Sequence, residues 1–238
     1  MEKKDLLKDV IKHIDIKSYN STELIDAMRN MSFTSRDTAR AADILMMMCK
    51  EKECTNILTL AGSTSAAGCM QVYVDMVRNK MIDVVVATGA SIIDMDLFEA
   101  LGFKHYIGEK ENVIADTTLR DLYIDRIYDT YIDEEELQAC DHTTFEIANM
   151  LEARPYSSRE FIYEIGKWLH EGHAVKKDSL IQTCYECGVP IFVPAFSDSS
   201  AGFGIGKHQW ERMQKGEKYL SIDSVKDFVE LTQIKMQA

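Results

Sequence analysis

Three short segments combine small, hydroxyl-bearing and acidic residues directly after runs of apolar residues. They are Gly62-Ser-Thr-Ser-Ala-Ala-Gly68, Thr88-Gly-Ala-Ser-Ile-Ile-Asp-Met-Asp96 and Ser197-Asp-Ser-Ser-Ala-Gly202. In an open α/β sheet, ligands bind beyond the carboxyl ends of the strands, where small residues let the backbone approach and helix N-termini attract phosphate. Together the segments favour a nucleotide-binding site, although small residues also form tight turns for purely structural reasons.

Aspartates stand at the most informative positions of these segments. Asp94 and Asp96 lie at the end of the second segment, and Asp198 lies near the start of the third. Carboxylates at strand ends can hold ribose hydroxyls or an ammonium group. Aspartate is also a preferred residue for capping the N-terminus of a helix, so each of the three has a structural alternative.

Three other motifs carry weaker chemical signals. The stretch Gly202-Phe-Gly-Ile-Gly206 lacks the third glycine of a dinucleotide fingerprint. Cys184 and Cys187 have the spacing of a zinc or redox pair, but no second cysteine pair accompanies them, so core packing is favoured. The stretch His170-Glu-Gly-His173 is one residue short of the metalloprotease pattern, and we interpret its glycine as a helix stop.

Two apolar runs lie on either side of a helical pattern. We expect these runs to form the strands that position the first two segments. Residues 56–61 and 82–87 are rich in β-branched side chains, and each run ends just before a small-residue segment. Met70, Val74 and Val77 recur at helical spacing between them. This order predicts a βαβ unit whose strands are parallel and buried on both faces.

Further elements extend the prediction along the chain. The expected helices lie at about 34–48, 134–151, 157–170, 178–187 and 222–234, with a strand at 189–194 and a loop at 195–206. Residues 109–133 are too mixed in period to assign. The predicted fold class is α/β, a Rossmann-like doubly wound, mostly parallel sheet with helices on both faces.

The chain divides into an arm and one domain. Residues 1–33 form an N-terminal arm with a short helix that Ser21 can cap. Residues 34–238 form a single α/β domain, which is a common size for one hydrophobic core.

The overall charge limits the classes of binding partner that we expect. The chain of 238 residues has 39 Asp and Glu against 27 Lys and Arg, a net charge of -12. Such a field repels nucleic acid and anionic membranes and suits a cationic polyamine, although many proteins are acidic for solubility alone. Without a signal-peptide pattern or a long apolar window, the protein is expected in the cytoplasm, with its six cysteines reduced.

Several longer stretches resemble deoxyhypusine synthase. They are Leu60-Ala-Gly-Ser-Thr-Ser-Ala-Ala-Gly, Val85-Val-Ala-Thr-Gly-Ala, Phe161-Ile-Tyr-Glu-Ile-Gly-Lys and Val189-Pro-Ile-Phe-Val-Pro-Ala-Phe-Ser-Asp-Ser-Ser. The match runs in order from about residue 31 to the end of the chain. Stretches such as Glu99-Ala-Leu-Gly-Phe-Lys-His-Tyr look more like the prokaryotic deoxyhypusine-synthase-like branch.

The resemblance implies an NAD-dependent transferase of polyamine metabolism. In this family NAD takes a hydride from a polyamine, a lysine holds the aminobutyl group as an imine, and an acceptor amine receives it before the hydride returns. The donor and acceptor stay open among spermidine, putrescine, agmatine and a protein lysine. A homotetramer is also implied.

The resemblance also implies site residues by position. It places eight residues against NAD: Gly62, Ser63, Thr64, Thr88, Gly89, Ala90, Asp96 and Asp198. Asp94 falls in the region that binds the amine substrate. Phe203 stands where the family has a second acidic residue, a departure that bears on the choice of polyamine.

The family's carboxyl-terminal third, with its imine-forming lysine, has no counterpart in this sequence. The resemblance therefore assigns no catalytic lysine, and it predicts an aminobutyl transferase that is inactive as this isolated chain. The alternative is a non-catalytic paralogue or partner subunit that assembles with a full-length relative. In both cases we expect an oligomer, because removing a third of a fold exposes core surface.

Overall fold

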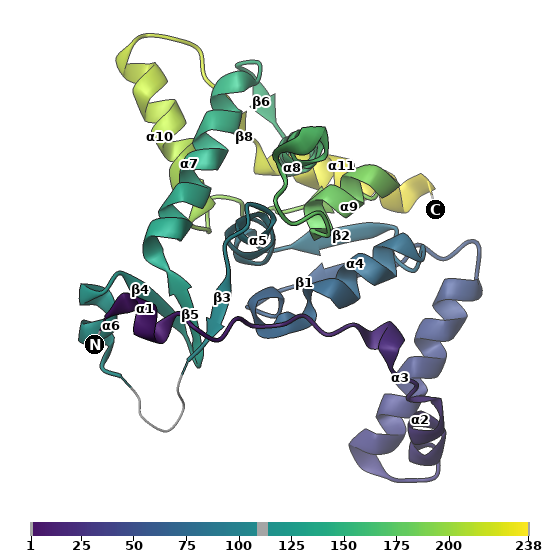
Figure 1. Cartoon of the computed structure of the whole chain (residues 1–238). Coiled ribbons are helices and arrows are strands. Elements are labelled where there is room, and N and C mark those ends of the chain that lie inside the picture. Colours follow the sequence, from purple (N-terminus) through teal and green to yellow (C-terminus); the bar gives the residue numbers. More distant parts are fainter. Residues whose placement is uncertain (1, 109–113, 238) are drawn as a thin grey trace.

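A parallel sheet carries the predicted segments in this computed structural model, which describes residues 2–108 and 114–237 (Figure 1). The strands β1 (Ile57–Leu60), β2 (Val84–Ala87) and β7 (Ile191–Phe192) pair in the order β1-β2-β7. The helix α4 (Met70–Arg78) connects the first two strands, so the predicted parallel βαβ unit is confirmed. The predicted burial on both faces holds for β2 but is wrong for β1, which lies at the edge of the sheet with Ile57 and Thr59 exposed. Since the three strands are parallel, their carboxyl ends meet at one edge of the sheet.

The other described strands form two small sheets. The first is antiparallel, in the order β3 (His105–Ile107), β5 (Thr130–Asp133), β4 (Ile124–Ile127). In the second, β6 (Pro155–Tyr156) pairs in parallel with β8 (Ser221–Ile222). The α/β class is therefore confirmed in its coarse form, whereas the described strands divide among three sheets and do not join into one doubly wound sheet.

The hairpin of β4 and β5 lies in the stretch that could not be assigned from sequence, of which residues 109–113 fall outside the described chain. Its turn consists of Tyr128 and Asp129, and Tyr128 adopts a φ of 54°. Two-residue hairpin turns of this conformation usually carry asparagine or glycine. The hairpin therefore has no recognisable turn signal in the sequence.

Most of the predicted helices are confirmed. They are α7 (Glu134–Met150), α8 (Ser158–Trp168), α9 (Leu180–Cys187) and α11 (Ser224–Gln237). Two short helices that were not predicted also occur, α5 (Phe98–Ala100) and α6 (Asp116–Asp121). A capping box starts α8, where Ser157 N donates to Glu160 Oε2 at 2.9 Å and Glu160 N donates to Ser157 Oγ at 3.1 Å. Gly172, with a φ of 112°, ends the helical turn that follows α8, as interpreted.

The helix α10 (Ala201–Gln214) occupies part of the stretch predicted as a loop. The prediction of a loop through residue 206 is wrong because glycine serves helix packing there. A Cβ atom at Gly204 would overlap Thr144 Oγ1 on α7 and lie 3.1 Å from Phe145 N. Glycine therefore lets α7 and α10 approach closely, which sequence periodicity cannot distinguish from loop flexibility.

We expect Gly204→Ala to lower the melting temperature, although alanine is favoured over glycine inside a helix by about 1 kcal/mol. The added methyl group would overlap Thr144, and overpacking costs about 1–3 kcal/mol. Gly206→Ala is the matched control, because nothing lies within 4 Å of a Cβ atom at that position. Thermal unfolding followed by circular dichroism compares the two, and equal melting temperatures would contradict the close packing of α7 and α10.

Three helices precede the parallel sheet: α1 (Lys3–Leu6), α2 (Thr22–Met28) and α3 (Phe33–Lys50). The helices α2 and α3 pack against each other and project from the rest of the chain (Figure 1). The predicted helices at these positions are confirmed, but Ser21 makes no capping bond with any described residue. Asn20 Oδ1 instead accepts from Thr22 N at 3.0 Å. The expected boundary at residue 33 falls within this helix pair.

The main hydrophobic core lies between the parallel sheet and the helices packed on it. Its buried members include Leu60, Val74, Val85, Ile93, Phe161, Ile165, Ile181 and Ile191. All six cysteines are free, with Cys184 buried in α9 and Cys187 exposed. Within the described ranges, no helix is long and apolar enough to cross a membrane, and no group of histidine, cysteine and acidic residues could hold a metal ion.

Candidate functional site

The three small-residue segments meet at the carboxyl edge of the parallel sheet. Ser91 Oγ donates to Gly62 O at 2.8 Å, and Ser65 Oγ donates to Ser91 O at 3.2 Å, so the first two segments are joined directly. Gly89 lies against the third segment, where a Cβ atom would be 2.6 Å from Ser199 Oγ. The common direction of the strands thus brings together segments that are far apart in the sequence.

The first two segments present open backbone and hydroxyl groups at this edge. Gly62 is exposed with a φ of 72°, and no atom of the described residues lies within 4 Å of a Cβ atom there. Thr88 is exposed, whereas Ser63 and Ala90 are half-buried. The half-buried Thr64 accepts a hydrogen bond at Oγ1 from a tyrosine of α4 at 2.8 Å. A glycine with positive φ and free space above it leaves its peptide groups accessible to a ligand.

Asp198 is the most accessible acidic group of the three segments. It is exposed in the loop after β7, and its backbone N–H donates to Ala195 O at 2.9 Å. Its carboxylate forms no hydrogen bond or ion pair with any residue that the structure describes. The group is therefore free to accept hydrogen bonds from a hydroxyl or ammonium group of a ligand.

Asp94 ties the second segment to the third. Its Oδ2 accepts from Ser200 N at 3.0 Å and its Oδ1 accepts from Ala201 N at 3.1 Å, which are the first N–H groups of α10. Burial raises the pKa of Asp94, and the two N–H groups offset part of that rise. In this structure Asp94 caps the N-terminus of α10, which is the structural alternative given for it above. The cap anchors the loop that carries Asp198.

Asp96 caps the N-terminus of α9 in the same way. It is 1% exposed, and its oxygens accept from Leu180 N at 2.9 Å and Ile181 N at 2.8 Å. Burial raises the pKa of Asp96 to about 6 despite these hydrogen bonds. Because both oxygens are used and the side chain is covered, the structure places Asp96 beneath the surface as a helix cap.

Asp141, on α7, is a neighbour of the site that sequence reasoning missed. Both its oxygens accept from Ser200 Oγ, at 2.7 and 2.8 Å. Burial raises the pKa of Asp141 to about 6, and the charge of Asp94 acts in the same direction although the Ser200 hydroxyl opposes it. Asp141 also lines a cavity of about 170 Å³ between α7 and α10, together with Phe203. It carries no local motif, because only tertiary packing brings its helix to the third segment.

Comparisons with known proteins identify the family of this chain. The family model for deoxyhypusine synthase matches residues 23–238. Deoxyhypusine synthase-like proteins of Caulobacter vibrioides and Coxiella burnetii are 65% and 58% identical, over 100% and 99% of this chain. The chain spans 64% and 66% of the length of these two relatives. A crystal structure named for deoxyhypusine synthase, from Entamoeba histolytica, shares the fold with a TM-score of 0.63 at 19% identity, covering 96% of this chain and 78% of that one.

Proposed function

Because the chain belongs to the deoxyhypusine synthase family, we propose that it binds NAD at the carboxyl edge of its parallel sheet. The reaction we propose for this site is NAD-dependent transfer of an aminobutyl group from a polyamine to an amine. We expect no turnover by the isolated chain, to which no catalytic lysine is assigned. The observation that carries the proposal is the convergence of three small-residue segments, which Ser91 and Gly89 hold in contact. In this proposal β1, β2 and β7 serve as the dinucleotide-binding strands of a Rossmann-like sheet.

The residues at the edge fit a dinucleotide. The open backbone at Gly62 allows close approach of a phosphate or sugar. The hydroxyl of the exposed Thr88 is hydrogen-bonded to Ser91 Oγ at 3.0 Å, which fixes the start of the second segment. The free carboxylate of Asp198 can accept hydrogen bonds from ribose hydroxyls. Asp94 keeps that carboxylate in place by capping α10. When bound, NAD supplies reversible hydride acceptance, while these groups of the chain bind and orient it.

Negative charge beside α10 supports an amine as the second ligand. Asp94 and Asp141 both lie at the N-terminus of this helix, and the chain has a net charge of -12. Such a field attracts ammonium groups and raises their local concentration. The donor and acceptor remain those that the family resemblance implies: spermidine, putrescine, agmatine or a protein lysine.

Calorimetric titration with NAD, with and without spermidine, tests the proposal. We expect saturable binding, and we expect Asp198→Ala to weaken it roughly tenfold to a hundredfold, because hydrogen bonds to a charged group contribute about 1.5–3 kcal/mol. Asp37→Ala, an exposed aspartate of α3, is the matched control and should bind like the unmodified chain. If the folded chain binds no NAD, the proposal fails and the partner-subunit alternative gains support.

We also propose that the chain assembles with copies of itself, as a tetramer by the family resemblance. Large apolar side chains on α3 are exposed to 89% at Phe33, 56% at Met46 and 61% at Met47. Large apolar side chains that are exposed on one helix suggest a surface for association with another protein chain. Light scattering should give a mass above that of one chain, and a clean monomer at micromolar concentration would contradict the assembly.

A further inference from the structure

An extended stretch at residues 9–14, here called the N-terminal strap, connects the antiparallel sheet to the first small-residue segment. Ile107 N donates to Asp9 O at 2.7 Å and Ile11 N donates to His105 O at 2.9 Å, so the strap begins by pairing with β3. Ile14 N then donates to Gly68 O at 3.0 Å. Figure 1 shows this stretch of chain running from β3 past β1 on its way to α2.

His13, within the strap, links the helices that follow the first and second segments. Its Nδ1 accepts from Met70 N, the first residue of α4, at 3.2 Å. Since Nδ1 accepts an N–H group, the ring proton lies on Nε2, which donates to Glu99 Oε2 of α5 at 2.6 Å. The imidazole is 14% exposed, so both bonds are largely shielded from water.

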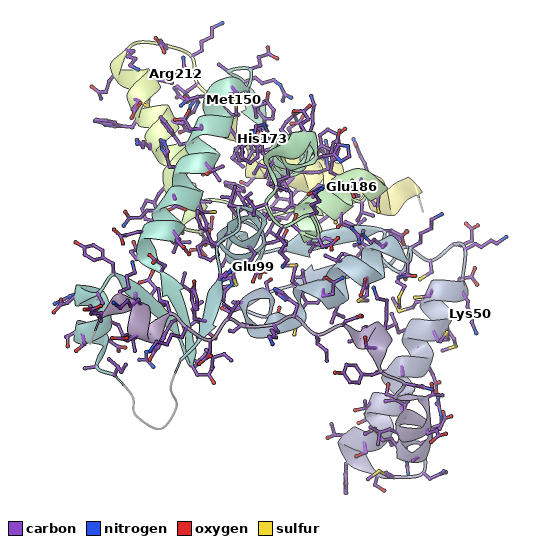
Figure 2. All side chains as sticks on the ribbon, in the orientation of Figure 1. Lys50, Glu99, Met150, His173, Glu186 and Arg212 are labelled. Carbon is purple, nitrogen blue, oxygen red and sulfur yellow. The ribbon has the colours of Figure 1, made fainter. Side chains whose placement is uncertain are left out.

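Glu99 and Gly68, which lie on the two sides of His13, make further close contacts. Glu99, which is labelled in Figure 2, lies in the interior of the molecule. It also accepts from His105 Nδ1 at 2.9 Å and from Lys176 Nζ at 2.5 Å. On the other side, Gly68 has a φ of 91° and a Cβ atom there would lie 2.8 Å from Lys12 O. The strap therefore contacts the end of the first segment directly, and a side chain at Gly68 would collide with it.

We propose that His13 is a positioning residue of the NAD site, which sets the spacing between segments 62–68 and 88–96. The inference rests on the proposed function. On the ligand side these segments are joined through Ser91, which donates to Gly62 O and accepts from Ser65 Oγ, whereas His13 joins the helices behind them. The contacts of Ser91 at the ligand side and of His13 behind it together hold the two segments at a defined distance and angle. A dinucleotide that spans both segments requires such a fixed arrangement.

Three substitutions at His13 separate its two bonds. His13→Ala removes both, His13→Asn retains an acceptor near Nδ1 for Met70 N, and His13→Gln retains a donor near Nε2 for Glu99. We expect His13→Ala to weaken NAD binding about tenfold or more, because small misplacements of binding groups are costly. Each conservative variant should recover part of the affinity.

Leu119→Ala is the control for a general loss of stability. Leu119 is buried in a separate small cluster with Ile124 and Tyr131, away from the parallel sheet. Its truncation should lower the melting temperature and leave NAD affinity unchanged. If His13→Ala reduces affinity no more than Leu119→Ala does, His13 is only a structural residue and the inference fails while the proposed NAD site stands.

Hydrogen exchange measured by mass spectrometry tests the spacing without NAD. His13→Ala should accelerate exchange in peptides covering 62–70 and 88–97 and leave α7 and α10 unchanged. Unchanged exchange in both segments would overturn the inference whether or not the chain binds NAD. Absence of NAD binding by the unmodified chain, in contrast, would overturn the proposed function itself.

Discussion

Replacing Glu99 with alanine should lower the free energy of unfolding by about 3–5 kcal/mol, the usual cost of removing one partner from a buried ionic cluster. The side chain of Glu99 is 11% exposed and accepts hydrogen bonds from His13, His105 and Lys176. Without the carboxylate, three basic groups from separate segments lose a common acceptor. Chemical unfolding at pH 7 measures the loss.

The same cluster predicts a pH dependence. Burial alone would raise the pKa of Glu99, but hydrogen bonds from His105 and His13 and the charge of Lys176 hold it well below its usual value of 4.5. A carboxyl group whose pKa is lower in the folded state stabilises that state above the unfolded pKa, and this stability is lost as the pH falls. We therefore expect the unmodified chain to lose stability below about pH 4.5, and Glu99→Ala to lose less over the same range.

Glu146→Ala is the matched control for Glu99→Ala. Glu146 is an exposed residue of α7, paired with His142 at 3.4 Å. Exposed pairs contribute about 0–1 kcal/mol, so this variant should keep both the stability and the pH profile of the unmodified chain. If Glu99→Ala behaves like Glu146→Ala at pH 7, the four groups do not act as a stabilising cluster.

The βαβ unit and the meeting of the three segments were predictable because their signals are local. Residues 56–61 and 82–87 are apolar runs, and each is followed at once by small residues. Once the strands are parallel, geometry alone brings their carboxyl ends to one edge. The position of Asp198 in an open loop follows from the same reasoning.

The roles of Asp94 and Asp96 could not be decided in this way. Aspartate serves equally as a helix cap and as a ligand-binding group. The choice depends on whether a helix N-terminus from a distant part of the chain reaches the carboxylate. Here α9 begins 84 residues after Asp96 and the capped N–H group of Ser200 lies 106 residues after Asp94.

The cluster around Glu99 could not be predicted from the sequence for a related reason. Its members come from the N-terminal strap, α5, β3 and the segment before α9. Glu99 and His105 lie in the stretch 99–106 that resembles the family, but that pattern does not indicate that they meet His13 and Lys176. Likewise, glycines in α10 indicated a loop because a sequence does not show which helix will pack against them. Each of these features depends on packing between residues far apart in the sequence, whereas the strands of the parallel sheet follow from local sequence patterns.

Gly89→Ala should have the largest effect on the proposed NAD site. Gly89 has helical dihedral angles, with a φ of -57°, so its backbone suits alanine. The added Cβ atom, however, would overlap Ser199 Cβ and lie 2.6 Å from Ser199 Oγ. The third segment, which carries Asp198, must then move away from the second. We expect NAD affinity to fall at least about tenfold and stability to fall by about 1–3 kcal/mol, the range for overpacking.

A second substitution isolates this contact as the cause. Ser199→Gly removes both atoms that the new methyl group would meet, so Gly89→Ala combined with Ser199→Gly should recover most of the NAD affinity lost in Gly89→Ala. Ser199→Ala is the matched control, because it removes the hydroxyl but keeps the Cβ atom that overlaps, and it should rescue little. Titration of the single and double variants gives the coupling between the two positions. If the effects of Gly89→Ala and Ser199→Gly simply add, the second and third segments do not rely on this contact, and their convergence cannot be what forms the site.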